Sequence, residues 1–527
     1  MTERNESKNN KFIVTSKSIT IFAILVILIL SLAITSNSMI KPISRDEQMY
    51  CTGAYLIAQG KMIYRDYSYI AQMPYHPLLY ASVYKITGTK YYLLTGRIIS
   101  TICDILVMIC IFGIYRSVFK SSIISGTLLG LGAAVIYVFN PLVDYANGYA
   151  WNHDVVILCV MLSLWLFILT DFNKKSSFWL TAAMGVLLTF AACMRITTFL
   201  VVLLFLLILL SLPAASIKQR IKTASPFIAA SILVLIWPVW IIAHAPKAFY
   251  LNLFKIPTLN GKWLHEIGMV YDKLDLTIAS LTTPGYFILM FLVVYLWVTI
   301  FFLRHNLKIN DKPKVFLTTL LPLVFFITAF IPPTMWKQYL AVPVPFILAS
   351  LAFPFMFLQN QSSIKKLRKY YKISIVIIVI GFLVSVATYP VVIQRIPAVI
   401  VPEVWTPIEV HRIANDIANE MVKPGLILTL APLYAIEGGC NIYTELSCGS
   451  FVYRIADLLS AEERRITKTI GPKSLPELVS EKPPSVVITN VDMEFLDKTI
   501  FDSAVDMNWR KKEYENGPTV YFRTIGW

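Results

Sequence analysis

The sequence of 527 residues predicts an α-helical polytopic membrane protein, with about 11 transmembrane helices, that ends in a mixed α/β soluble domain. Hydrophobic residues make up 57% of the chain and charged residues only 15%, against roughly 25% charged in a soluble domain. Residues 391–527 hold 14 Lys+Arg and 18 Asp+Glu, which leaves 33 and 13 for residues 1–390. The net charge of +16 therefore comes from an apolar membrane domain, 1–390, and does not indicate a nucleic-acid partner.

Eleven apolar runs approach the length of a membrane-spanning helix, which needs about 20 residues to cross a hydrocarbon layer about 30 Å thick. The fifth and sixth runs are short and are separated only by residues 193–198, so we expect a hairpin there. The runs lie near 19–40, 98–115, 122–139, 153–170, 177–194, 197–213, 224–243, 285–303, 315–331, 339–358 and 373–390.

Basic residues fall in the N-terminal segment and in every second loop, for example at Arg116, Lys218 and Lys369. Because cytoplasmic loops carry an excess of Lys and Arg, this alternation places the N-terminus in the cytoplasm. The membrane is expected to be the cell (inner) membrane, and an odd number of spans then places the C-terminal domain on its extracytoplasmic side.

Acidic residues before position 391 are scarce, yet most of them fall on the predicted outer face. This distribution indicates chemistry or polar recognition outside the membrane. The eight outer carboxylates are Asp46, Glu47, Asp66, Asp144, Asp154, Glu266, Asp272 and Asp275.

The first outer loop, 41–97, carries the most informative motifs. Two carboxylates, Asp46 and Glu47, follow the first span directly, and carboxylates at a membrane boundary are costly unless they are hydrated, paired or functional. A solvated loop start that helps to set topology is the simpler alternative. Two further motifs follow, Gly60-x-x-x-Tyr64-Arg65-Asp66 and Gln72-x-Pro74-x-x-Pro77.

These motifs resemble the GT-C superfamily of integral membrane glycosyltransferases, in particular bacterial protein O-mannosyltransferases and lipid A aminoarabinose transferases. The resemblance covers about residues 1–390 as an ordered set of features. The later features are Asn152-His153-Asp154, the stretch from Gly185 to Arg195, and Trp336-Lys337-Gln338-Tyr339 followed by Pro343 and Pro345.

The resemblance implies a polyprenyl-phosphate sugar donor, a lipid, polysaccharide or protein acceptor, and chemistry on the non-cytoplasmic face. Transfer needs a base for the acceptor hydroxyl and cations for the departing phosphate. We assign Asp46 as the general base, with Glu47 assisting or orienting it. Arg65, Arg195 and Lys337 are the candidate phosphate partners. The candidate substrate-binding residues are Tyr64, Asp66, Gln72, His76, His153, Asp154 and Tyr339.

Several of these residues have a structural alternative. Arg195 lies where two short helices meet, so snorkelling to the interface explains it equally well. Tyrosines of the first outer loop suit stacking on sugars, but an aromatic belt has the same composition. The aminoarabinose transferases carry a Lys-Pro-Pro-like turn where this chain has Gln72-Met73-Pro74-Tyr75-His76-Pro77, so Arg65 or His76 is expected to substitute for that lysine in contacting the donor phosphate.

No required cofactor is expected, because paired Cys/His spacing and H-E-x-x-H are both missing from the sequence. A divalent ion held by Asp46, Asp66 and Asp154 remains an alternative. Arg97 and Asp104 are two helical turns apart, and we expect them to form a structural ion pair.

The C-terminal domain is expected to contain a helix over 407–422 and strands at 426–430, 485–489 and 520–522. Cys440 and Cys448 are candidates for a disulfide in an oxidising compartment.

Two other functions stay open at this point. A transporter or flippase of lipid-linked intermediates would show internal repeats, which the sequence does not. A non-catalytic assembly subunit would not depend on Asp46.

Overall fold

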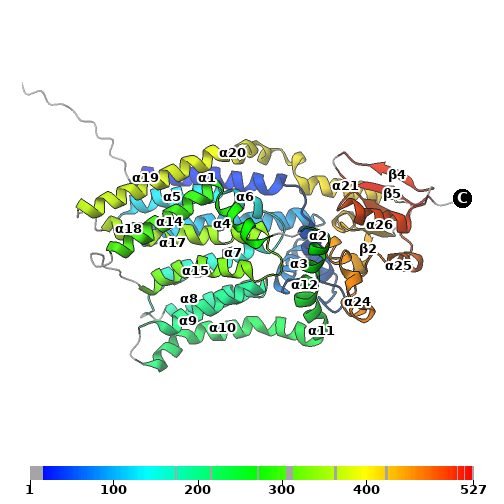
Figure 1. Ribbon diagram of the computed structural model, residues 1–527, viewed down its shortest axis with the longest axis horizontal. Helices are drawn as coiled ribbons and strands as arrows, with labels where there is room; N and C mark the ends of the chain where they lie inside the picture. Colours follow the sequence, from blue (N-terminus) through cyan, green and yellow to red (C-terminus); the bar gives the residue numbers. More distant parts are fainter. Residues whose placement is uncertain are drawn as a thin grey trace, which may run out of the picture.

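The computed structural model describes residues 16–524, apart from 173, 175, 214–215, 270–271, 304–311, 361–364, 422–424, 507 and 516. The predicted cytoplasmic N-terminal segment lies outside these residues. Three layers follow one another along the long axis: a bundle of long helices, a set of shorter helices at one end, and an α/β domain beyond them (Figure 1). We call the end of the bundle that faces the α/β domain the site end.

All eleven predicted apolar runs are helical in the described chain. Seven of the helices are long and apolar enough to cross a membrane: α1, α4, α10, α14, α15, the run α16–α18, and α19. The other four are shorter apolar helices, so the chain is a multi-pass membrane protein while the count of eleven spans stays a prediction. The bounds are α1 (Ser16–Ile40), α4 (Tyr92–Val118), α5 (Ile123–Val138), α7 (His153–Leu169), α8 (Ser177–Ala192), α9 (Phe199–Ser211), α10 (Ile217–His244), α14 (Pro284–Leu303), α15 (Lys312–Phe330), α16 (Lys337–Ala341), α17 (Pro343–Ser350), α18 (Ala352–Asn360) and α19 (Lys365–Thr388).

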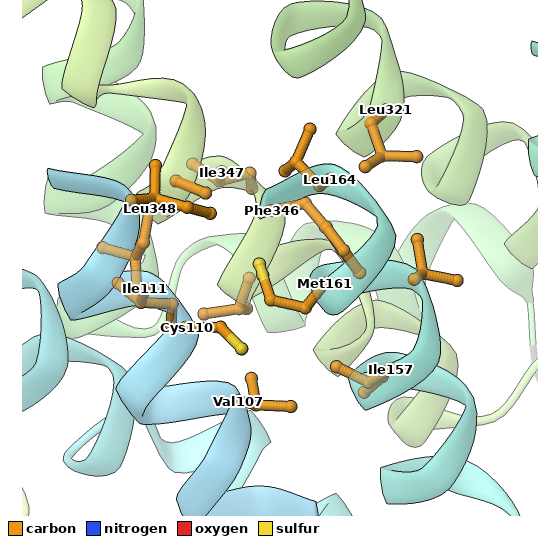
Figure 2. Packing of buried hydrophobic residues seen from close by; sticks show 14 of the residues in the cluster. Val107, Cys110, Ile111, Ile157, Met161, Leu164, Leu321, Phe346, Ile347 and Leu348 are labelled. Carbon is orange, nitrogen blue, oxygen red and sulfur yellow. The ribbon is translucent and has the colours of Figure 1, made fainter. Parts of the chain in front are cut away.

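The centre of the bundle lies where α4, α7, α15 and α17 meet. Apolar side chains from these helices converge there, among them Ile111, Met161, Leu321 and Phe346 (Figure 2). Helix α17 and helix α7 beyond its first turn are almost entirely apolar, as expected of elements that are surrounded by other helices.

The chain breaks between α8 and α9 as the sequence predicts. Helix α8 ends at Ala192, Arg195 has an extended backbone, and a short 3-10 turn, η1 (Ile196–Thr198), leads into α9. Gly185 lets α8 approach α10 closely, because a Cβ at this position would lie 2.4 Å from the carbonyl oxygen of Phe227. The break thus points its polar backbone and Arg195 toward the site end.

The predicted first outer loop is largely helical. Ser44 and Glu47 form a capping box that starts α2, because the Glu47 side chain also accepts a hydrogen bond from the Ser44 backbone. The helices of the site end are α2 (Arg45–Ala58), α3 (Tyr75–Thr87), α6 (Pro141–Ala146), α11 (Pro246–Tyr250), the π-helical turn η2 (Leu251–Lys255), α12 (Ile256–Glu266) and α13 (Lys273–Leu281).

The C-terminal domain is built on a mixed sheet in the order β2-β1-β3-β5-β4. Strand β1 is parallel to β2 and β3, and β5 is antiparallel to β3 and β4, so the predicted helix and three strands are confirmed and β2 and β4 are added. The strands are β1 (Leu426–Thr429), β2 (Asn441–Ile442), β3 (Val486–Thr489), β4 (Arg510–Glu513) and β5 (Thr519–Phe522). The helices and 3-10 turns are α20 (Val391–Arg395), η4 (Ile396–Ile400), η5 (Pro402–Val404), α21 (Thr406–Glu420), α22 (Leu433–Ile436), η6 (Thr444–Leu446), α23 (Ser450–Tyr453), η7 (Ala456–Leu458), α24 (Ala461–Thr467), α25 (Leu475–Glu481) and α26 (Glu494–Ala504).

Polar contacts fasten this domain to the site end. The Leu433 amide donates to the Gln48 side chain at 2.9 Å, and the Leu93 amide donates to Glu437 at 2.7 Å. Helix α2 and the start of α4 therefore carry hydrogen-bond partners for the sheet domain.

The predicted disulfide is wrong, since both of its cysteines are free. Cys448 is buried against the membrane domain and donates to the Ser68 carbonyl at 2.9 Å, whereas Cys440 contacts Met421 within its own domain. Cys448 thus contacts the membrane domain, whereas Cys440 makes its contact inside the C-terminal domain.

Candidate active site

A cavity of about 580 Å³ opens between the site end and the C-terminal domain. Its size is within the range of small-molecule sites. Helix α2, the 193–198 break, α12, the α15–α16 connection and α23 each contribute to its lining. The charged side chains among the described lining residues are Arg45, Asp46, Arg195 and Arg454.

The first turn of α2 sends its two carboxylates in different directions, because successive residues of a helix are about 100° apart. Asp46 lines the cavity, while Glu47 is fully buried on the bundle side. Glu47 accepts from the Ser44 and Ala150 amides at 2.8 and 2.7 Å and from two Arg97 nitrogens at 2.9 Å each. With four hydrogen bonds made, its carboxylate positions α2 and has no open side toward the cavity.

Arg97 pairs with Glu47, which corrects the expected Arg97–Asp104 ion pair. The guanidinium reaches back to the end of α1 and donates to the carbonyls of Ser38 and Lys41 at 2.9 and 2.8 Å. Asp104 instead accepts from the Tyr137 hydroxyl and, at 2.8 Å, from the Asn147 amide. Helical spacing placed Arg97 and Asp104 on one face, but tertiary partners determine where each side chain binds.

Asp46 is the one carboxylate among the described residues that line the cavity. Across the part of the chain that the structure covers, no side chain or amide donates to its carboxylate. Burial raises its pKa, and Arg454, Arg45 and Arg195 oppose this rise. An unpaired carboxylate with a raised pKa, open to a cavity, is suited to accept a proton.

Arg195 lines the cavity opposite α2, and its guanidinium lies 5.1 Å from the centre of the Tyr339 ring. Among the described residues, no ion pair or hydrogen bond engages this guanidinium. Its donors are therefore free for an anion such as a phosphate.

Two other candidate phosphate partners lie away from the cavity. Arg65 forms a two-bond pair with Asp66, with both distances 2.8 Å, and lowers the Asp66 pKa at the protein surface. Lys337 is exposed at the start of α16 and does not line the cavity, although its neighbours Trp336 and Gln338 do.

Two of the candidate substrate-binding residues line the cavity, and the other five do not. Gln72 and Tyr339 line the cavity, and Gln72 accepts from the Asn152 side chain at 2.6 Å. Tyr64 is buried and donates to the Gln72 carbonyl at 2.6 Å.

The two candidate histidines and Asp154 are buried in the protein. His76 packs against Tyr50 and Tyr80, and its burial lowers its pKa to about 3, so the ring is neutral. Neither His76 nor His153 has a hydrogen-bond partner among the described residues. Asp154 accepts from the Gly148 amide at 2.9 Å.

The proposed divalent-ion ligands Asp46, Asp66 and Asp154 do not form a site together. Over the described ranges, no three His, Cys, Asp or Glu side chains come close enough to hold a metal ion. Of these three carboxylates, Asp46 lines the cavity, whereas Asp66 and Asp154 do not.

The sequence reasoning missed Arg454 and its surroundings. This side chain comes from the C-terminal domain, next to α23, and lines the cavity together with Ser450 and Phe451 of the same domain. Nothing in the local sequence indicates that role, whereas the Ser44-x-x-Glu47 spacing was a readable sign of α2.

The helical bundle, the site-end cavity and the C-terminal sheet domain together define a multi-pass membrane protein whose fold matches several solved structures. No protein-family model matches the chain, and no curated protein matches it in sequence. The fold is therefore established by comparison with solved structures.

One of these is ArnT from Cupriavidus metallidurans bound to undecaprenyl phosphate. It matches with a TM-score of 0.57 and 12% identity over 96% of this chain and 98% of that chain. The oligosaccharyltransferase AglB from Archaeoglobus fulgidus, in complex with an inhibitory peptide and a dolichol-phosphate, matches with a TM-score of 0.51 and 12% identity over 92% and 71%. An oligosaccharyltransferase from Archaeoglobus fulgidus in complex with Zn and sulfate matches with a TM-score of 0.50 and 14% identity over 90% of this chain and 68% of that chain.

Proposed function

We propose that the chain is a membrane glycosyltransferase that moves a sugar from a polyprenyl-phosphate donor to an acceptor hydroxyl, with Asp46 as general base. The observation that carries the proposal is the free carboxylate of Asp46 in a cavity whose other charged lining residues, among those described, are arginines. The acceptor is a lipid, polysaccharide or protein, and the reaction belongs to the non-cytoplasmic face.

The chemistry needs one proton acceptor and one anion partner. Asp46 takes the proton of the acceptor hydroxyl as the oxygen bonds to the anomeric carbon of the sugar. The bond from that carbon to the phosphate oxygen breaks, and its electron pair leaves on the lipid phosphate. Arg195 is placed to stabilise this charge with its free guanidinium donors.

Two similar structures support the kind of donor. ArnT was solved bound to undecaprenyl phosphate and AglB with a dolichol-phosphate, so two proteins of this fold bind a polyprenyl phosphate. The ligand site in this chain fits the same chemistry, since an unpaired arginine lines the cavity among membrane-domain residues.

The decisive experiment gives the purified protein, in liposomes, radiolabelled polyprenyl-phosphate sugars together with lipid, glycan and peptide acceptors. Wild-type protein is expected to transfer label, and Asp46→Asn is expected to lose roughly 10²–10⁴-fold in kcat, the usual contribution of a general base. Asp275→Asn removes an exposed carboxylate at the site end, outside the cavity, and is expected to match the wild type.

Wild-type transfer by Asp46→Asn would overturn the assignment of the base. Failure of the wild-type protein to transfer any lipid-linked sugar, together with movement of the intact donor across the liposome membrane, would replace the enzyme with a flippase.

A further inference from the structure

Arg454 reaches out of the C-terminal domain into the membrane domain. The residue is 8% exposed. Two of its nitrogens, Nε and Nη2, donate to the side-chain oxygen of Asn260 on α12 at 3.1 and 2.7 Å. The guanidinium also lies 5.1 Å from the Trp263 ring and 5.0 Å from the Phe451 ring. An amide and two aromatic faces thus fix a buried cation at the cavity wall.

No carboxylate forms an ion pair with Arg454 in the described part of the chain. Its neighbour Arg45 is already paired, with Nε 3.1 Å from Asp492, and Ser450 donates to the same carboxylate. A buried cation without a paired anion is costly, so its retention calls for a function. The carboxylate that shares the cavity with Arg454 is Asp46.

We propose that Arg454 is a positioning residue of the transfer site, which the C-terminal domain inserts beside the cavity to keep Asp46 ionised and able to accept a proton. The inference rests on the proposed role of Asp46 as base. It makes the C-terminal domain a part of the catalytic unit, because the membrane domain alone would lack this charge.

Five groups besides Arg454 lie close enough to interact with the charge of Asp46. They are Arg45, Glu47 and Tyr50 on α2, Arg195 in the break before η1, and Tyr339 on α16. Arg454 exerts the largest attraction on the Asp46 charge and opposes the rise in pKa that burial causes.

The test measures the ionisation of Asp46 directly. A carbodiimide with an amine nucleophile modifies protonated carboxyls, and mass spectrometry follows the labelling of Asp46 across a pH series in the full-length detergent-solubilised protein. In Arg454→Gln, the midpoint of labelling is expected to rise by about one pH unit, the lower end of the effect of a nearby opposite charge. Arg454→Lys is expected to restore most of the wild-type midpoint.

A second variant keeps Arg454 in place. Asn260→Asp puts a carboxylate at hydrogen-bond distance from the guanidinium, which neutralises its charge toward Asp46, so the midpoint is again expected to rise. Arg510→Gln breaks an ion pair with Glu420 on the far side of the same domain and is the matched control, with no shift.

The inference would be overturned if Arg454→Gln and Asn260→Asp both showed the same labelling midpoint as the wild-type protein. Because labelling needs no sugar, this result is separate from a failure of the proposed function, which is absence of transfer by the wild-type protein. Where transfer is measured, the acid limb of kcat is expected to move by the same amount as the labelling midpoint.

Discussion

Arg97 and Glu47 form an enclosed ion pair of two parallel hydrogen bonds, each 2.9 Å long, and neither side chain is exposed to solvent. The pair joins α4 to the first turn of α2. Arg97 also holds carbonyls at the end of α1. Three segments that converge at the site end are thus fixed by one guanidinium, and the direction of Asp46 follows from them.

Glu47→Gln is expected to destabilise the protein by about 3–5 kcal/mol, because it leaves Arg97 as a buried charge without a partner. Thermal unfolding of the detergent-solubilised protein measures the effect. Asp46→Asn, one residue away, is the control and should not lower stability. Equal stability of Glu47→Gln and the wild type would show that the buried pair does not hold α2.

Asp46→Asn is expected to stabilise the protein at neutral pH. The folded-state pKa of Asp46 is raised by burial, so the folded chain binds this proton more tightly than the unfolded chain. The resulting stability is present below the unfolded pKa and is lost as the pH rises through the folded pKa. The melting temperature of Asp46→Asn should therefore exceed the wild-type value at neutral pH, and the difference should shrink as the pH falls. A lower melting temperature at neutral pH would contradict the burial of an unpaired carboxylate.

Local signals in the sequence predicted most of the membrane domain. An apolar run of about 20 residues is readable without knowledge of its neighbours, and each of the eleven runs is a helix. Helix α2 was missed because Arg45, Asp46 and Glu47 make its first turn polar, although the Ser44–Glu47 capping box marked its start.

The candidate site was predicted only in part, because its partners are distant in the sequence. Asp46 and Arg195 do line one cavity. Glu47 was grouped with Asp46, because nothing in the neighbouring sequence shows that the Glu47 carboxylate forms an ion pair with Arg97. Arg454 could not be found from the sequence, because only the docking of the C-terminal domain brings it to the cavity.

Arg195→Gln is expected to raise the KM for the lipid-linked donor by tenfold or more, since each lost charge-assisted hydrogen bond is worth about 1.5–3 kcal/mol. Arg65→Gln should raise it far less, because Arg65 is paired with Asp66 outside the cavity. Initial rates at varied donor concentration measure both. The reverse order of effects would place the donor phosphate next to α2 and α3 instead of the α8–α9 break.

Gly449→Ala is expected to destabilise the C-terminal domain by about 1–3 kcal/mol and to reduce transfer. Gly449 has φ +60° at the start of α23, and a Cβ there would lie 2.6 Å from the Leu430 carbonyl oxygen. To relieve this contact α23 would have to shift, and Arg454 at its C-terminal end would move with it. Gly439→Ala is the matched control, because its φ is +73° but its Cβ would meet no atom within 4 Å. Equal melting temperatures for the two variants would show that backbone strain alone decides the effect.

Cysteine labelling tests the sidedness of the site end. The side chain of Lys61, which follows α2, and that of Lys120, between α4 and α5, are both exposed. Each position is changed to cysteine in intact cells and treated with a membrane-impermeant thiol reagent. Lys61→Cys is expected to react and Lys120→Cys to react only after the membrane is opened, because α4 separates the two positions.

A reporter fused after residue 527 should respond on the Lys61 side, since the C-terminal domain contacts α2 directly. Reaction of Lys120→Cys in intact cells would reverse the orientation that the basic loops predict.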